Sequence, residues 1–88
     1  MAREIYTNPQ MMAKIQIISD SEENSYSDIP GWKGGYMAEA RSGLAVLLYF
    51  PDRPGKDAEV WFPYSQLRKA EDDQSIYASN WILEQKKL

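Results

Sequence analysis

One uncharged run constrains the fold of this chain more than any other stretch. Leu44–Phe50 has no charged residue in seven positions and carries β-branched and aromatic side chains. A run this short that stops at a proline is typical of a buried strand rather than of a helix. Pro51–Asp57 then combines prolines, a glycine and short polar side chains, which is typical of a turn. With the strand-like stretch 58–67, these residues predict a central hairpin from Ser42 to Phe62.

The size of the chain limits its core. It has 88 residues, of which 43% are apolar, with three Trp, six Tyr and two Phe. A domain of this length buries only about 60–65% of the surface that its unfolded chain exposes. It has no Cys and no His, so it has neither a disulfide nor a zinc site to reinforce the core. We therefore expect close packing or a homodimer.

Other short periodic stretches predict further strands. Alternating side chains predict a strand over 11–18, with Ile15 and Ile17 facing inward, and another over 36–41. Residues 76–78 predict a third short strand. The fold class that follows is α+β and β-rich: a small, mainly antiparallel sheet of four or five strands with one short C-terminal helix packed on it. The sequence leaves open whether the sheet closes into a partial barrel.

The C-terminal helix is predicted over 80–87. Ser79 is a favourable N-cap for it, and lysines near its end suit the helix dipole. Because so short a helix is not stable alone in water, Trp81 and Leu88, with Ile82 or Leu83, should dock on the sheet.

Polar stretches separate these elements. Residues 1–10 contain an Asn-Pro turn signal and no sustained period, so we predict a loosely ordered N-terminal arm before a single domain over 11–88. Residues 19–28 are acidic and serine-rich, which predicts a loop, and 69–74 predicts a solvated turn.

The acidic loop has some of the features of a calcium-binding loop but lacks two that such a loop requires. Asp20, Glu22 and Asn24 stand at alternate positions, as ligands of an EF-hand loop do. The sixth position of that loop requires Gly and is Ser25, and the twelfth requires Glu and is Gly31. We predict no metal and no cofactor.

The glycine-rich loop 29–36 is a candidate contact loop. It displays Trp32, Lys33 and Tyr36, and two rings with a cation can stack on a base or anchor in a pocket of a partner. The alternative is a turn whose Trp32 folds back over the core.

A second group of candidate binding residues surrounds Pro63. A proline cannot donate to a sheet, so the strand before it lies at an edge, bulges or ends there. Trp61 and Phe62 should face opposite sides of that strand. The candidate binding residues beyond the break are Tyr64, Gln66, Asp72 and Asp73.

The second half of the chain resembles a group of small bacteriophage proteins. The resemblance is carried by Glu59–Leu67, which fits a strand of the form Glu-Val-Trp-hydrophobic-Pro-x-Ser-Gln-hydrophobic, and by the Trp-containing ending Ser79–Leu88. It extends back to the strand 45–50 and leaves the first 43 residues unmatched. Tyr64 stands where the group has a basic residue. The resemblance implies a phage or prophage accessory protein and no particular activity.

The chemistry of the side chains argues against an enzyme. Without His and Cys, the commonest general base and the thiol nucleophile are both absent. The first hypothesis is a non-catalytic phage protein that binds a host protein or nucleoprotein complex, such as an anti-CRISPR or other anti-restriction inhibitor. Acidic loops would then occupy a nucleic-acid channel of the target. Such a protein would act in the cytoplasm of the infected bacterium, without a membrane segment.

The alternative hypothesis is a small β domain that binds single-stranded nucleic acid. Aromatic rings beside a basic groove are typical of such domains. The rings available are those of Trp32, Tyr36, Trp61 and Tyr64. The net charge of −3 counts against this hypothesis.

Overall fold

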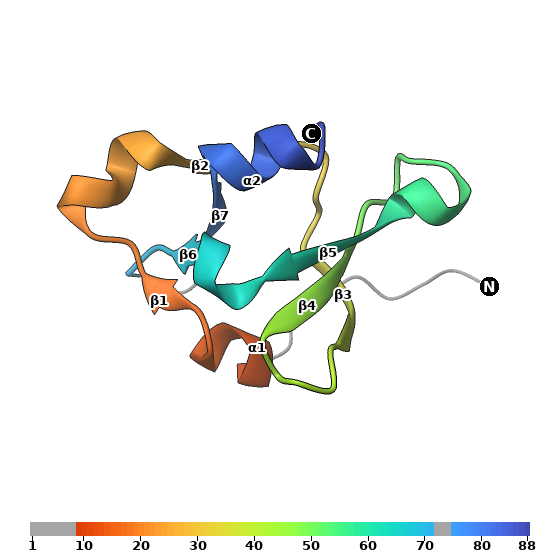
Figure 1. Cartoon of the computed structure of the whole chain (residues 1–88), viewed down its shortest axis with the longest axis horizontal. Helices are drawn as coiled ribbons and strands as arrows, with labels where there is room; N and C mark the ends of the chain where they lie inside the picture. Colours follow the sequence, from red (N-terminus) through yellow and green to blue (C-terminus); the bar gives the residue numbers. More distant parts are fainter. Residues whose placement is uncertain (1–8, 72–74) are drawn as a thin grey trace.

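The computed structural model describes residues 9–71 and 75–88, which form two sheets and two short α-helices (Figure 1). In chain order, with η for a 3₁₀ helix, the elements are α1 Pro9–Ala13, β1 Gln16–Ile17, η1 Asp20–Ser25, β2 Tyr26–Asp28, β3 Gly35–Glu39, β4 Ala45–Tyr49, η2 Gly55–Ala58, β5 Glu59–Pro63, η3 Tyr64–Gln66, β6 Leu67–Lys69, β7 Ile76–Ser79 and α2 Asn80–Gln85. One sheet has the order β3-β4-β5 and the other β1-β6-β7-β2.

The three-stranded sheet contains the predicted central hairpin. β4 and β5 pair antiparallel, with Val46 opposite Phe62 and Leu48 opposite Val60. β3 pairs antiparallel with the other edge of β4, and its register shifts between Tyr36 and Ala38. The uncharged run therefore forms the central strand of this sheet, but within β4 only Val46 and Leu48 are fully buried, because the other face of this antiparallel sheet is partly open to solvent.

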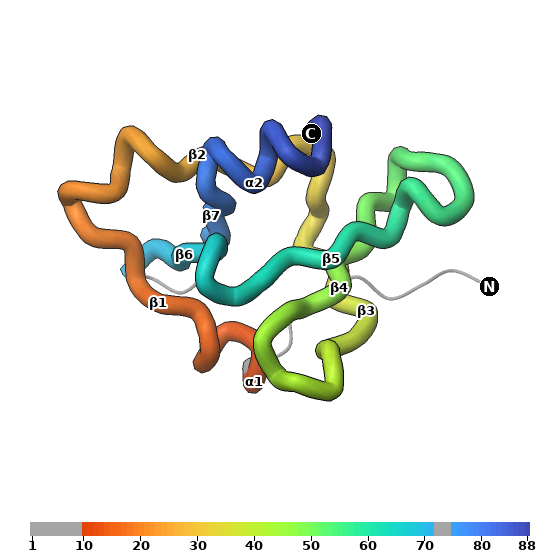
Figure 2. Tube along the Cα trace, viewed as in Figure 1, coloured from red at the N-terminus to blue at the C-terminus, as the bar shows by residue number. Residues whose placement is uncertain are grey.

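The second sheet was not expected. β6 and β7 pair antiparallel, β2 pairs antiparallel with β7, and the two-residue β1 pairs parallel with β6. Figure 2 shows how the chain turns from β5 through η3 directly into β6. The α+β, β-rich class is confirmed. The described residues, however, form seven strands in two sheets and no closed barrel, because Pro63 ends one strand and the next begins in another sheet.

The core lies where the two sheets and both helices meet. Its largest fully buried side chains come from both sheets and from α1: Phe50, Phe62, Met11, Leu48, Leu67 and Val46. The rings of Phe50 and Phe62 stack with centroids 6.3 Å apart. α2 adds Ile82 and Leu83 to the same core. The sheets therefore form one packed unit.

The strand predicted over 11–18 is wrong. Met11 and Met12 lie on α1, and only Gln16–Ile17 are extended. Ile15 is buried as predicted, but Ile17 is 52% exposed. Met11 and Ile15 are four residues apart, a spacing that also places two side chains on one side of a helix. The alternation of side chains therefore did not distinguish a strand from a helix at these residues.

The stretch 19–28 also differs from the predicted loop. It forms η1 and then β2. The Glu22 carboxylate accepts from both the backbone N–H and the hydroxyl of Ser19, which closes the first turn of η1. The local polar bonds that predicted a loop therefore stabilise a 3₁₀ helix.

The C-terminal helix follows its predicted start. The Ser79 hydroxyl accepts from the backbone N–H of Ile82 at 3.0 Å, so Ser79 is the N-cap. Ile82 and Leu83 are buried, and Leu88 packs against the core. Trp81 is 59% exposed, so its predicted docking is wrong. Two adjacent aliphatic side chains suffice to dock this short helix.

Candidate functional site

In the predicted contact loop, Trp32 and Tyr36 pack against the core, whereas Lys33 is exposed. The indole Nε1 of Trp32 donates to the carbonyl of Gly35 at 2.8 Å, and the ring packs against the core. Gly31 and Gly34 have φ values of 78° and 91°, which explains why the turn needs glycine. The ring therefore covers the core, as the alternative interpretation expected.

A shallow pocket lies beside this loop. Its volume is about 310 Å³, and its walls are Asp28, Ile29, Trp32, Lys33, Gly34, Ser75 and Ile76. Trp32 and Lys33 are thus brought together. Tyr36 is not among the lining residues: it lies opposite Leu48 in β3 and packs against the core.

Tyr64 does not offer its ring to solvent, which contradicts its expected role in stacking. The side chain is 8% exposed, and its hydroxyl donates to Oε2 of Glu39 at 2.8 Å. The Lys14 ammonium is 2.7 Å from Oε1 of the same carboxylate and lies 5.7 Å from the centre of the Tyr64 ring. This cluster ties η3 and the turn after α1 to β3.

The cluster shifts the pKa of both acids in it. Burial first, and then the hydrogen bond to the Glu39 carboxylate, raise the pKa of the Tyr64 phenol. The hydrogen bond from Lys14 first, and then the one from Tyr64, lower the pKa of Glu39. Tyr64 therefore acts as a neutral donor within the fold.

Gln66 also has a structural partner. Its side-chain oxygen accepts from the hydroxyl of Ser79, the N-cap of α2, so the turn after β5 is joined to the start of the helix. The two remaining predicted residues, Asp72 and Asp73, lie outside the described residues.

The exposed ring on the central sheet belongs to Trp61. Along β5, Val60 and Phe62 pair with the core-facing side of β4, whereas Trp61 is 43% exposed on the opposite face. The predicted alternation of Trp61 and Phe62 is therefore confirmed. Trp61 lies opposite Leu47 in the register, and both line a hollow of about 270 Å³ with Lys56 and Glu59.

Further apolar residues continue this surface along the strands. Ala45 and Pro63 form the next cross-strand pair on the same face as Leu47 and Trp61. Leu44, in the turn before β4, is 71% exposed but lies in register with Tyr64, so it has the parity of the core-facing Val46 rather than of Trp61. We name this surface the Trp61 face; it consists of Ala45, Leu47, Trp61 and Pro63. Its signal in the sequence was the alternation of β5, which put Trp61 and Phe62 on opposite faces but did not say which of them is exposed.

The free edge of β5 offers few backbone groups. In an antiparallel pair of strands, hydrogen-bonded and non-hydrogen-bonded residue pairs alternate. The Phe50 N–H bonds to the Ala58 carbonyl, and the Tyr64 N–H bonds to the Leu44 carbonyl, so the pair of Leu47 and Trp61 is a non-hydrogen-bonded one. The N–H of Trp61 therefore points away from β4. The N–H of Glu59 bonds to the carbonyl of Lys56, and Pro63 has no N–H. A partner strand would find one donor here, so side chains must supply most contacts.

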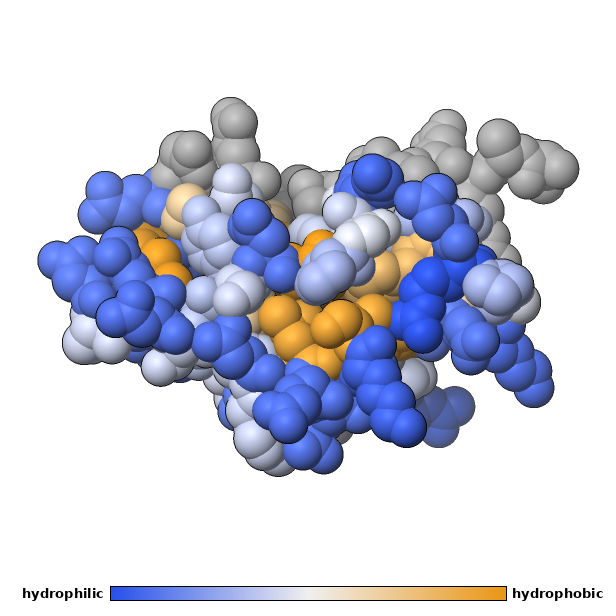
Figure 3. Space-filling view, turned by 90° about the horizontal axis from the view of Figure 1, so that it is seen from above, coloured by the Kyte–Doolittle hydropathy of each residue, from blue (hydrophilic) through white to orange (hydrophobic). Residues whose placement is uncertain are grey.

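Apolar surface is also present elsewhere. Seen from the side of α2, apolar residues gather near the middle of the molecule and hydrophilic ones surround them (Figure 3). Trp81, on α2, is the second largely exposed tryptophan. It belongs to the other sheet's side of the fold, since α2 contacts β7. Substitution of Trp81 is therefore a suitable control for substitution of Trp61, because both rings are exposed but lie on different parts of the fold.

Comparisons with family models, curated proteins and solved structures find no match to this chain. Within residues 9–71 and 75–88, no three acidic side chains converge in a way that could hold a metal ion. In the same ranges, no helix has the length and apolar character to cross a bilayer. The exposure of Trp61 beside Leu47 makes the Trp61 face the candidate site that the chain's own geometry favours.

Proposed function

We propose that this protein is a non-catalytic binding module that engages another protein through the Trp61 face. The observation that carries the proposal is the 43% exposure of Trp61 next to Leu47, on the solvent side of a sheet whose other side is core. Tryptophan is enriched among the residues that dominate binding energy, and such residues lie in pockets ringed by less important contacts.

The charges beside Trp61 favour a protein over a nucleic acid. Lys56 and Glu59 line the same hollow and carry opposite charges. A groove that follows a phosphate backbone needs several cations together. Of the four rings considered for base stacking, Tyr64 is buried and Trp32 and Tyr36 pack against the core. One exposed ring beside one lysine makes a poor platform for a strand of bases.

The resemblance to phage proteins supplies the context of the proposal. The residues that carry the resemblance include β5 itself, with Trp61 at its centre. We infer that the partner is a protein of the bacterial host, and that the module acts as an inhibitor of a defence complex, such as an anti-CRISPR or other anti-restriction protein. The lack of His and Cys supports binding rather than catalysis.

The proposal predicts that Trp61 is essential for capture of one bacterial partner. Tagged wild-type protein, Trp61→Ala and Trp81→Ala would each be incubated with bacterial lysate, and the bacterial protein retained by the wild type would be identified. That bacterial protein would then be purified, and its affinity for the three tagged proteins measured by calorimetry. Loss of a central tryptophan costs about 2 kcal/mol or more, so Trp61→Ala should bind about 30-fold more weakly. Trp81→Ala should bind like the wild type.

The same preparation would be titrated with single-stranded oligonucleotides in low salt. We expect no retardation. Equal affinity of Trp61→Ala and wild type for the partner would refute the Trp61 face as the contact surface. Salt-sensitive oligonucleotide binding that Trp61→Ala weakens would instead favour the nucleic-acid function.

A further inference from the structure

A row of polar and aromatic side chains crosses the outer face of the four-stranded sheet. The registers place Gln16 beside Arg68, Arg68 beside Tyr77 and Tyr77 beside Asp28, on four neighbouring strands. Tyr26 precedes Asp28 by two residues on β2 and therefore faces the same side. Core residues occupy the other face, so this row faces outward.

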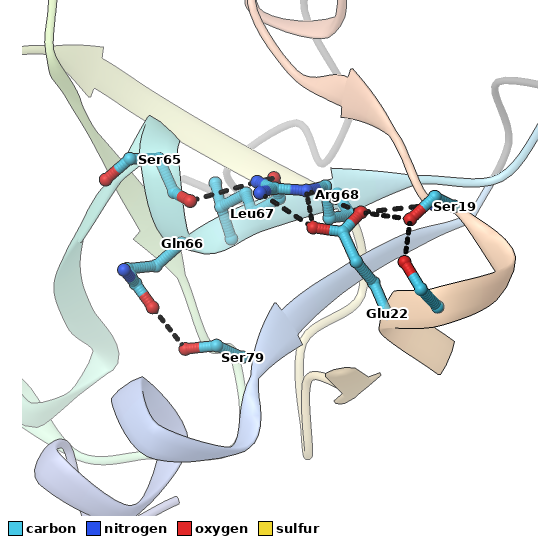
Figure 4. A network of polar contacts seen from close by, with 8 residues as sticks. Ser19, Glu22, Ser65, Gln66, Leu67, Arg68 and Ser79 are labelled. Atoms are coloured by element: carbon cyan, nitrogen blue, oxygen red, sulfur yellow. Dashed lines mark hydrogen bonds and ion pairs between the residues drawn. The ribbon is translucent and has the colours of Figure 1, made fainter. Parts of the chain in front are cut away.

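One cation on this face is already paired. The Arg68 guanidinium lies 4.9 Å from the centre of the Tyr26 ring and 3.0 Å from Oε2 of Glu22. Figure 4 shows Arg68 between the Glu22 carboxylate of η1 and the backbone carbonyl of Ser65. The pKa of Glu22 is lowered by the hydrogen bond from Arg68 and then by the backbone N–H of Ser19. The charges of Arg68 and Glu22 therefore compensate each other.

The next carboxylate along η1 is that of Glu23. Glu23 and the rings of Tyr26 and Tyr77 line a pocket of about 220 Å³, with Ile18 as the fourth wall. Among the described residues, no hydrogen bond or ion pair engages the Glu23 side chain. Two electron-rich rings, an apolar wall and an uncompensated carboxylate together favour a cation that also has an apolar stem.

We propose that this pocket binds the cationic side chain of an arginine or lysine presented by a partner protein. Charge complementarity supports this occupant, because η1 also carries Asp20 and the whole chain has a net charge of −3. Arg68 on Tyr26 is an internal example of the same contact. The proposal rests on the proposed function in that the partner is a protein, but the pocket is formed by residues remote in sequence from the Trp61 face.

The test uses short blocked peptides and the whole folded protein. Acetyl-Gly-Arg-Gly-amide, its lysine counterpart and its citrulline counterpart would be titrated while NMR signals of the Tyr26 and Tyr77 rings are followed. Citrulline has the shape of arginine without its charge. The arginine and lysine peptides should shift both rings saturably, and the citrulline peptide should bind at least about fivefold more weakly.

Two variants separate this contact from general charge attraction. Glu23→Gln should weaken arginine-peptide binding at least about fivefold, whereas Asp20→Asn, which removes the same charge from the same 3₁₀ helix, should change it by less than about twofold. Tyr77→Phe should retain binding and Tyr77→Leu should lose it, since the ring and not the hydroxyl forms the wall.

Four outcomes would overturn the proposal: no shift with any peptide, equal binding of citrulline, equal effects of Glu23→Gln and Asp20→Asn, or binding of free methylguanidinium but not of the arginine peptide. The last would make the pocket a site for small cations only. The peptide titration does not require the host partner. A negative peptide titration would therefore not affect the proposal for the Trp61 face. Equally, a failure of Trp61→Ala to weaken partner capture would not affect the peptide result.

Discussion

The three tryptophans of the chain occupy three different environments. Trp32 is fixed by a hydrogen bond from its indole to Gly35, Trp61 faces solvent from a strand, and Trp81 faces solvent from a helix. The period of a strand predicted that Trp61 and Phe62 face opposite sides, and the structure shows that Phe62 is the buried one. The sides of the other two depended on packing partners distant in the sequence.

At the same scale, Tyr64 and Glu39 predict a dependence of stability on pH. Because the pKa of Glu39 is lower in the folded protein than its ordinary value of 4.5, its contribution to stability is complete above that value. The contribution is lost as the pH falls through the lowered pKa. Tyr64→Phe removes one donor to Glu39, so the pKa of Glu39 should rise toward its ordinary value.

The measurement is the urea midpoint of unfolding at about pH 7 and about pH 3.5. The fall in midpoint on acidification should be smaller for Tyr64→Phe than for wild type. Tyr77→Phe, on the outer face of the other sheet, should show the wild-type fall. An unchanged fall in Tyr64→Phe would mean that its hydroxyl does not stabilise the Glu39 carboxylate.

At the scale of elements, α2 illustrates how a six-residue helix persists. Such a helix has too few internal hydrogen bonds to form alone. Its first turn is closed by Ser79, which also donates to Gln66, and its apolar side is held by Ile82 and Leu83. The cap was predictable from a local preference, whereas the tie to Gln66 was not, because it joins two elements.

Ser79→Ala should therefore destabilise the protein by about 1–2 kcal/mol, through loss of the cap and of the bond to Gln66. Urea unfolding followed by circular dichroism measures this free energy. Ser75→Ala, a surface serine whose hydroxyl has no bond among the described residues, is the control and should change stability by less than about 0.5 kcal/mol. Equal effects of the two substitutions would contradict the assigned role of Ser79.

The elements α1 and β1, by contrast, were not predictable from local preferences. Short apolar runs such as 11–18 satisfy both the helical and the strand period, so local pattern does not decide between them. α1 forms because Met11, Met12 and Ile15 are all buried in the core. β1 is only two residues long and exists because β6 lies beside it. Both depend on contacts with residues more than 40 positions away.

At the scale of the whole molecule, the two sheets share one core. Phe62 from β5 and Leu67 from β6 are both fully buried, although they belong to different sheets. Single small domains of this kind unfold as one cooperative unit. The two exposed tryptophans report on opposite parts of the fold: Trp61 on the three-stranded sheet, and Trp81 on the helix that packs on β7.

Two variants with one tryptophan each test this cooperativity. Trp32→Phe/Trp81→Phe retains Trp61, and Trp32→Phe/Trp61→Phe retains Trp81. In each variant, the urea transition seen by fluorescence should coincide with that seen by circular dichroism, with an m value of about 1 kcal/mol/M. A fluorescence midpoint displaced from the circular dichroism midpoint would mean that the two sheets unfold separately.

The sequence alone determined the parts of this protein that follow from short-range physics. The uncharged run and the turn after it predicted the β4–β5 hairpin, and Ser79 predicted the start of the last helix. Alternation predicted that Trp61 and Phe62 lie on different faces of their strand. Each depends on the period of a strand, the geometry of proline and glycine, or a cap within three residues. The α+β, β-rich class followed from the same signals.

Only the tertiary structure decided the division into two sheets, the burial of Tyr64 and the pocket formed by Glu23, Tyr26 and Tyr77. These features arise where strands pair across long stretches of chain. Side-chain pairing of this kind depends on which surfaces exclude water together, and a local pattern carries no information about its distant partner. The surfaces proposed for binding are therefore products of the fold, built on a hairpin that the sequence specifies.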